Sequence, residues 1–184
     1  MDSILFETNR TIVRKWTSSD IIAYYLLRSD PLVMKFIGEP LRDKRQAEKF
    51  LISRTIADYS KYGYGRYAVV LKASGDVIGN TGLLYLRELD RNDLAISLLP
   101  QYWGLGYGTE ILEKCVQYAF EELALPELIG LVDPLNIVSS KLLMKIGMIY
   151  SEKITYHDEA CNLYTLKQQD WSNKTLSRTI EELS

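Results

Sequence analysis

The sequence predicts one α/β domain of the mixed α+β kind, in which helices flank a central mixed, mostly antiparallel sheet. Three observations support this fold class. Hydrophobic residues make up 47% of the 184 residues, which is enough for one well-formed core. Short runs rich in β-branched and aromatic residues come first as hairpins, separated by turn residues. One strand–helix–strand unit then follows, and such a crossover requires a parallel pair of strands.

The N-terminal third is expected to contain one strand and two helices. Residues 7–16, ETNRTIVRKW, alternate enough between apolar and polar side chains to predict the first strand. Thr17 and Asp20 have the spacing of a capping box, which begins a helix that runs to about Leu27. A second helix is expected over residues 43–59.

The middle of the chain is expected to contain a hairpin, a loop and a further strand. Residues 61–86 hold two runs rich in Val, Ile, Leu and Tyr on either side of the turn sequence Ser74-Gly75-Asp76. The charged residues 87–93, RELDRND, are expected to form a solvated loop that includes Asp93. Residues 94–99, LAISLL, follow as a strand that Pro100 ends.

Five further elements are expected after Pro100. An amphipathic helix from about 106 to 123 precedes a short buried strand over residues 127–133. A short helix over residues 136–147 leads into a terminal antiparallel pair, residues 148–156 and 162–168. The longer helix places these residues on one core-facing stripe: Leu112, Cys115, Val116, Ala119, Phe120 and Leu123.

The domain organisation follows from the lack of a break in this pattern. No internal repeat or low-complexity linker interrupts the chain, so we expect a single domain over residues 1–172. Residues 173–184 form a C-terminal tail, which either adds a short helix or frays.

Composition excludes several classes of protein. A formal net charge of −2 argues against a broadly basic nucleic-acid-binding face, so no nucleic-acid partner is expected. No apolar run is long enough to cross a bilayer and the N-terminus lacks a signal-peptide pattern, so we expect a cytoplasmic protein with no membrane partner. Two cysteines and one histidine supply neither a disulfide framework nor a Cys/His zinc site, and no metal is expected. His157 lies in a polar stretch typical of a turn, which favours a loop histidine over a Ser-His-Asp triad.

Three glycines at alternate positions, Gly104, Gly106 and Gly108, lead directly into the longer amphipathic helix. Glycines allow a tight turn and a close approach to the backbone, and the first N–H groups of a helix have no internal partner. Together these features predict an anion site for a phosphate or diphosphate, although a plain tight turn accounts for the glycines equally well. The motif is neither a P-loop nor the G-x-G-x-x-G of a dinucleotide fold.

In combination with a second block, the glycine segment resembles the GCN5-related N-acetyltransferase (GNAT) family, in particular the branch typified by the ribosomal-protein N-terminal acetyltransferases. The family's Q/R-x-x-G-x-G/A acetyl-CoA loop is similar to residues 103–108, with Trp103 in place of Gln or Arg. Residues 136–148, NIVSSKLLMKIGM, resemble the family's Asn-x-x-Ser helix, with Met148 where an aromatic residue usually stands. The resemblance covers about residues 7–171.

The resemblance implies the GNAT acyl-CoA N-acyltransferase fold, with the parallel pair splayed apart where the pantetheine arm of acetyl-CoA enters. Main-chain groups at the end of the strand before the loop would face the pantetheine and acetyl group. The amides of the glycine segment would bind the diphosphate, and the Asn136 side chain would bind pantetheine or cap its own helix. The implied cofactor-binding residues are Leu98, Leu99, Trp103, Gly104, Leu105, Gly106, Tyr107, Gly108, Thr109, Asn136 and Ser139.

For catalysis, the resemblance implies direct attack of an amine on the thioester, with Ser139 as the group that protonates the departing thiolate; the alternative is an ordinary exposed helix serine. The strand that often carries a glutamate in relatives offers no carboxylate here, which favours an acceptor amine of low pKa, such as a protein N-terminus. Glu110 and Asp93 remain alternative bases.

The expected partners are therefore acetyl-CoA and an amine acceptor. Two alternatives stay open for function: acetylation of a small amine such as a polyamine, an aminoglycoside or an amino acid, and a non-catalytic relative that only binds acyl-CoA. The sequence is also compatible with a homodimer.

Overall fold

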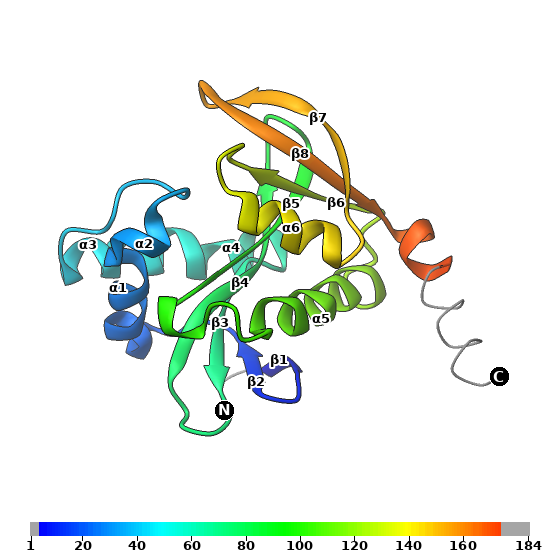
Figure 1. The fold of residues 1–184 in the computed structure, drawn as a ribbon. Helices are drawn as coiled ribbons and strands as arrows, with labels where there is room; N and C mark the ends of the chain where they lie inside the picture. Colours follow the sequence, from blue (N-terminus) through cyan, green and yellow to red (C-terminus); the bar gives the residue numbers. More distant parts are fainter. Residues whose placement is uncertain (1–3, 174–184) are drawn as a thin grey trace.

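The computed structural model describes residues 4–173, and its strands form one eight-stranded sheet (Figure 1). The strand order is β1-β2-β3-β4-β5-β6-β8-β7, and every neighbouring pair is antiparallel except β5 with β6. The predicted mixed, mostly antiparallel sheet with one parallel pair is confirmed. The strands are β1 (Ile4–Glu7), β2 (Thr11–Arg14), β3 (Arg66–Leu71), β4 (Val77–Leu86), β5 (Arg91–Leu98), β6 (Glu127–Val132), β7 (Ile149–Tyr156) and β8 (Glu159–Lys167).

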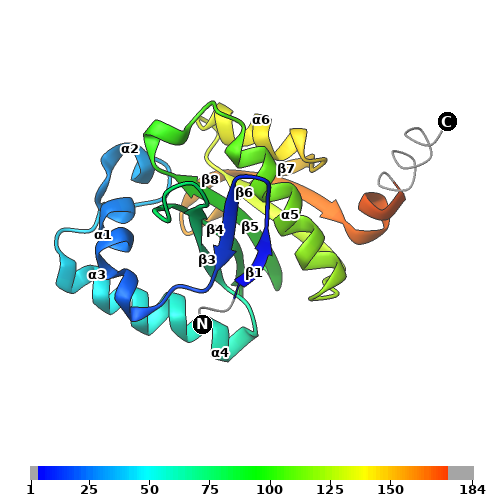
Figure 2. The same cartoon turned by 90° about the horizontal axis from the view of Figure 1, so that it is seen from below.

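Helices cover both faces of the sheet. Figures 1 and 2 show α1 to α4 gathered on one side and α5 with α6 on the other. The helices are α1 (Ile21–Ser29), α2 (Pro31–Met34), α3 (Lys44–Phe50), α4 (Ala57–Tyr62), α5 (Tyr107–Glu121) and α6 (Ile137–Lys145), with short 3-10 turns at Ser18–Asp20 and Pro100–Tyr102. Among the described residues, no helix is both long enough and apolar enough to span a bilayer.

The expected first strand over residues 7–16 instead contains the last residue of β1, a tight turn and the whole of β2, so that prediction is wrong in detail. The Thr8 hydroxyl oxygen accepts hydrogen bonds from the N–H groups of Arg10, at 3.3 Å, and Thr11, at 2.9 Å. A side chain that satisfies nearby backbone groups reverses the chain without glycine or proline. A count of alternating residues does not detect such a turn.

The second predicted helix is confirmed, but it contains a segment that was not predicted. Residues 44–62 form one continuous helical run, and its middle, Leu51–Ile56, is π-helical. The run ends at Gly63, whose φ of +82° is the left-handed conformation that terminates many helices.

The charged segment 87–93 is not the loop that was expected. Strand β5 begins at Arg91, so β4 and β5 form a tight hairpin that turns at residues 87–90. Asp93 therefore lies within β5, with only 8% of its surface exposed. The prediction failed because the partners that neutralise this carboxylate, described below, come from distant strands.

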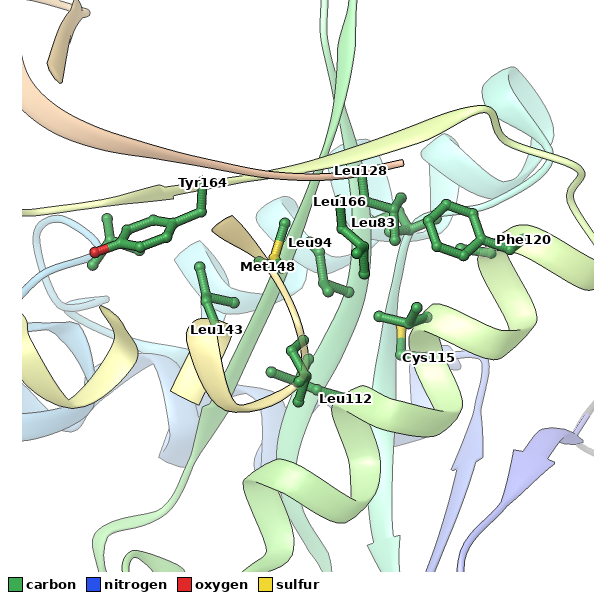
Figure 3. Close-up of a cluster of buried hydrophobic side chains, with 14 residues drawn as sticks. Leu83, Leu94, Leu112, Cys115, Phe120, Leu128, Leu143, Met148, Tyr164 and Leu166 are labelled. Atoms are coloured by element: carbon green, nitrogen blue, oxygen red, sulfur yellow. The ribbon is translucent and has the colours of Figure 1, made fainter. Parts of the chain in front are cut away.

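The main core lies between α5, α6 and the sheet (Figure 3). The predicted stripe of α5 is buried, except for Leu123, which lies beyond the helix and is partly buried. Residues 168–173 are helical, and the predicted tail, residues 173–184, lies outside the described residues apart from its first residue, so that prediction is not tested. Strand β6 and α6 approach closely, because a Cβ on Gly130 would lie 2.4 Å from the Leu143 side chain.

Candidate active site

The parallel strands β5 and β6 diverge shortly after they meet. A single residue pair, Asp93 with Ile129, joins them, although both strands run on to Leu98 and Val132. The two strands therefore form a fork that opens toward their carboxyl ends. Open α/β sheets bind ligands at this edge.

The Asp93 carboxylate fixes the base of the fork. One of its oxygens accepts the Leu131 N–H at 3.0 Å, so a side chain takes the place of a main-chain acceptor on β5. The other oxygen forms an ion pair with the Arg66 guanidinium at 2.7 Å. Arg66 also donates to the Gly82 carbonyl at 2.6 Å, which ties β3 and β4 to the same point. The fork is thus held from both sides by one buried ion pair.

The main chain of β5 presents free groups to the fork. Leu99 donates its N–H to the Ile78 carbonyl of β4 at 2.9 Å. Because successive residues of a strand direct their main-chain groups to opposite edges, those of Leu98 and Ile96 face away from β4 and toward β6. The expectation that Leu99 faces the cofactor is therefore wrong for its N–H, whereas the main-chain groups of Leu98 are directed toward the fork.

The indole of Trp103 occupies one main-chain acceptor on the edge of β5 that faces the fork, the carbonyl of Leu98. Its Nε1 donates to the Leu98 carbonyl at 2.6 Å, and the side chain remains 48% exposed. This bond holds the glycine segment against the end of β5. It leaves the N–H of Leu98 as the main-chain group that this residue offers to the fork.

The glycine segment forms the start of α5. Gly104 and Gly106 have φ values of +72° and +84°. Residues with a side chain are strained in this left-handed region, so the turn requires glycine at both positions. Gly106 is the N-cap residue and offers no side chain to the first turn, so the N–H groups of Tyr107, Gly108 and Thr109 lack a capping partner. The Thr109 hydroxyl has no hydrogen-bond partner in the described part of the chain. These unpaired donors are the groups that could bind an anion, as expected of this segment from the sequence.

Gly108 has a different role from the other two glycines. A Cβ at this position would lie 3.1 Å from the Leu142 side chain, so Gly108 allows α5 and α6 to pack closely. Its place in the motif therefore reflects helix packing as well as access to the backbone amide.

Arg10, which sequence reasoning missed, braces the glycine segment from the side. Its guanidinium donates to the Leu105 carbonyl at 2.9 Å and forms an ion pair with Glu110 at 2.8 Å. The same group stacks over the Tyr107 ring, 3.8 Å from the ring centroid. No local pattern identifies Arg10, because its contacts are formed with residues about one hundred positions further along the chain.

The contacts of Glu110 decide its charge. Burial alone would raise its pKa, but hydrogen bonds from Thr8 and Arg10 together with the Arg10 charge hold the pKa of this carboxyl below its usual range. Glu110 is therefore ionised and paired at neutral pH. Like Asp93, it is not a free base at this site.

Helix α6 contributes Asn136 and Ser139. The Asn136 Oδ1 accepts a hydrogen bond from the Ser139 N–H at 3.2 Å. Asn136 therefore caps its helix, which is one of the two roles expected for it. Its amide NH₂ stays available for a ligand. Ser139 is half-buried in the first turn of α6, whereas Ser140 beside it is buried.

In chemical terms, the site brings together free amides for an anion, a strand edge that can pair with an extended amide chain, and a hydroxyl. These groups fit the diphosphate, pantetheine and thioester of acetyl-CoA. No group of three or more possible metal-binding side chains occurs among residues 4–173.

A mixed sheet that forks at its one parallel pair, with a glycine-led helix at the opening, defines an acyl-CoA N-acyltransferase. Residues 10–149 match the family model described as acetyltransferase (GNAT) domain. The chain belongs to the GNAT family of acetyl-CoA-dependent acetyltransferases. This finding confirms the family that the two motifs predicted.

Known relatives agree with this membership. An uncharacterized N-acetyltransferase, p20, of Bacillus licheniformis is 31% identical over 76% of this chain and 79% of its own length. The uncharacterized N-acetyltransferase YoaA of Bacillus subtilis is 26% identical over 78% of this chain and 81% of its own.

Solved structures share the fold at lower identity. A ribosomal-protein-S5-alanine acetyltransferase from Vibrio fischeri has a TM-score of 0.72 and 21% identity, covering 90% of this chain and 97% of that one. A spermidine N-acetyltransferase from Vibrio cholerae, in complex with CoA and spermine, has a TM-score of 0.75 and 15% identity, covering 88% and 98%. At these identities the likeness concerns the fold.

Proposed function

We propose that this acetyltransferase acetylates a protein N-terminal α-amine and belongs to the branch of the ribosomal-protein N-terminal acetyltransferases. One observation carries the choice of acceptor: both candidate bases are held in ion pairs, Asp93 with Arg66 and Glu110 with Arg10. An α-amine with a pKa of about 7.8 is neutral in roughly one molecule in seven at pH 7. A lysine amine, with a pKa of about 10.4, is neutral in roughly one in a few thousand. Only the first acceptor reacts readily without a strong base.

The proposed cofactor site follows the geometry described above. The diphosphate accepts hydrogen bonds from the first-turn amides of α5 and from the Thr109 hydroxyl, and pantetheine lies along the exposed edge of β5. Acetyl-CoA supplies an acetyl group activated as a thioester. The residues proposed to bind it are Leu98, Trp103, Gly104, Leu105, Gly106, Tyr107, Gly108, Thr109, Asn136 and Ser139, within a catalytic domain of residues 1–172.

The reaction needs three contributions from the chain. The Leu98 N–H, directed into the fork, donates to the carbonyl oxygen as negative charge develops there. The amine nitrogen forms the new C–N bond while the C–S bond breaks, and Ser139 gives its hydroxyl proton to the departing sulfur. The proton lost by the amine passes to water, and water restores the Ser139 hydroxyl.

The acceptor is tested by thiol release with a panel of amines. Peptides with a free N-terminus should react faster than the same peptides with a blocked N-terminus and a free lysine. Faster reaction with spermidine or an aminoglycoside would favour the small-amine alternative. Acetyl-CoA binding without turnover on any amine would favour the non-catalytic alternative.

The role of Ser139 is tested by Ser139→Ala, with Ser140→Ala as a matched control one residue further along α6. General-acid catalysis contributes about a hundredfold or more, so Ser139→Ala should lower kcat by roughly that factor, well beyond the loss of acetyl-CoA affinity that removing one contact causes. Equal kcat values for the two variants would remove Ser139 from the mechanism.

A further inference from the structure

Arg28, in the last turn of α1, has a buried Nε with no hydrogen-bond partner in the described part of the chain. No hydrogen bond or ion pair within that part of the structure involves its guanidinium. Buried polar groups are nearly always paired, and an arginine carries five donors. A guanidinium without an acceptor therefore requires an explanation.

The surroundings of Arg28 add positive charge. Burial, followed by the charges of Arg66 and Arg54, lowers the pKa of Arg28, and only the Tyr24 side chain opposes this shift. Arg66 is already paired with Asp93. Arg54 stacks over the Phe50 ring, 4.4 Å from its centroid, and has no carboxylate partner among the described residues. Two arginines thus lie near one another without an anion.

Arg28 lies on the same face of the sheet as Arg66, whose guanidinium pairs with Asp93 at the base of the fork. In β3, Tyr67 packs on the side of α5, and Ala68 packs against α1 and α3 on the opposite face. Since side chains alternate along a strand, Arg66 lies on the same face as Ala68. Its guanidinium reaches Asp93 at the base of the fork. Arg28 is part of α1, and Arg54 is part of the helical run from α3 to α4. These helices lie on the face of the sheet opposite α5 (Figures 1 and 2).

In the proposed site, the glycine segment and α5 lie on one face of the sheet, which leaves the opposite face for the approach of the acceptor amine to the thioester. The helical run that carries Arg54 is distorted to a π-helix at this point, and such distortions are frequent at functional sites. A purely structural arginine gains its stabilising effect from a partner, whereas the Nε of the half-buried Arg28 is buried without one, which costs free energy. The described structure offers Arg28 no such partner.

We propose that Arg28, assisted by Arg54, binds a carboxylate of the acceptor, close to the amine that is acetylated. The inference rests on the proposed function, since it assigns the acceptor of that same site. The carboxylate belongs either to an acidic side chain near the N-terminus of a peptide or to a free amino acid. Polycationic amines are disfavoured by the same charges.

The test compares acceptors that differ by one carboxylate. Two peptides that carry either aspartate or asparagine after the N-terminal residue are assayed beside free amino acids and their amides. Removal of a charged hydrogen-bond partner typically changes affinity by about tenfold or more, so the wild type should favour the acidic peptide over the amide by this factor in kcat/KM. A preference confined to free amino acids would assign the carboxylate to that source.

Arg28→Gln should remove the preference by raising KM for the acidic acceptor, with kcat and the KM for acetyl-CoA unchanged. Arg28→Lys should keep part of the preference for the acidic peptide, because lysine keeps the positive charge. Arg45→Gln, a control on the exposed surface of α3, should keep the preference in full. Because no partner is lost, the thermal midpoint of Arg28→Gln should not fall. If that variant does not fold, Arg54→Gln should weaken the preference in its place.

The outcomes separate the two proposals. Turnover of N-terminal amines without a preference for the acidic acceptor overturns only the role of Arg28. An equal fall in kcat/KM for both peptides in Arg28→Gln has the same consequence. Absence of turnover with every amine overturns the proposed function, and this inference with it.

Discussion

The ion pair at the base of the fork offers the sharpest test of how the fold positions the site. Asp93→Ala removes the 2.7 Å contact with Arg66 and the acceptor of the Leu131 N–H. The two charged side chains are only 17% and 12% exposed, so solvent screens them weakly. Removal of one partner from such a buried pair costs about 3–5 kcal/mol, a large part of the roughly 5–15 kcal/mol that keeps a domain folded.

A double-mutant cycle measures how much the interaction between Asp93 and Arg66 contributes to the free energy of unfolding. Arg66→Ala leaves Asp93 with one hydrogen bond, and the double variant leaves no unpaired charge, so the double variant should be more stable than the sum of the two single changes. We expect a coupling free energy of about 1–3 kcal/mol. Urea unfolding followed by tryptophan fluorescence measures it, since the chain contains three tryptophans.

The same variants report on catalysis. A loosened fork should lower kcat more than it raises the KM for acetyl-CoA, because the proposed diphosphate site on α5 does not involve Asp93. A coupling free energy below about 0.5 kcal/mol, which is within the additivity of independent sites, would refute the view that this pair fixes the fork.

Two further predictions concern the brace on the glycine segment. Arg10→Ala removes a partly exposed ion pair and a cation–π contact, so it should lower the free energy of unfolding by only about 1 kcal/mol. It should also weaken acetyl-CoA binding, which isothermal titration measures. Unchanged binding would show that Arg10 does not organise the glycine segment. The pKa of Glu110 is depressed in the folded state, so its stabilising effect is present above the unfolded value of about 4.3 and is lost as the pH falls through the folded value. The difference in thermal midpoint between wild type and Glu110→Gln should therefore be constant from neutral pH to about pH 5 and vanish in stronger acid; a difference independent of pH would contradict the pairing.

Local patterns predicted most of the fold because each of them reports a local cause. The turn at Ser74-Gly75-Asp76, the stripe of α5 and the crossover from β5 to β6 were all visible in spacing and residue type. The turn after β1 was not, since a threonine side chain closes it in place of glycine. The π-helical segment at Leu51–Ile56 was also missed, because its residues have ordinary helical character.

The candidate site divides in the same way. The glycine segment, Asn136 and Ser139 could be named as candidates from the sequence because they form contiguous motifs. Arg10, Arg66 and Arg28 were missed, and Asp93 was assigned to a loop, because their roles depend on contacts across the sheet. Charged residues in a single sequence resemble surface residues until their partners are known.

The central claim is that free amides at the start of α5 bind the diphosphate of acetyl-CoA. Isothermal titration of the wild type, Gly106→Glu and Gly63→Glu tests it most directly. Gly63 has a φ of +82° and Gly106 a φ of +84°, so the two substitutions introduce the same backbone strain and the same charge, but only Gly106 is at the site. We predict stoichiometric binding of acetyl-CoA by the wild type and Gly63→Glu, and a large loss in Gly106→Glu. Absence of binding by the wild type at millimolar acetyl-CoA, or equal binding by all three proteins, would contradict the claim.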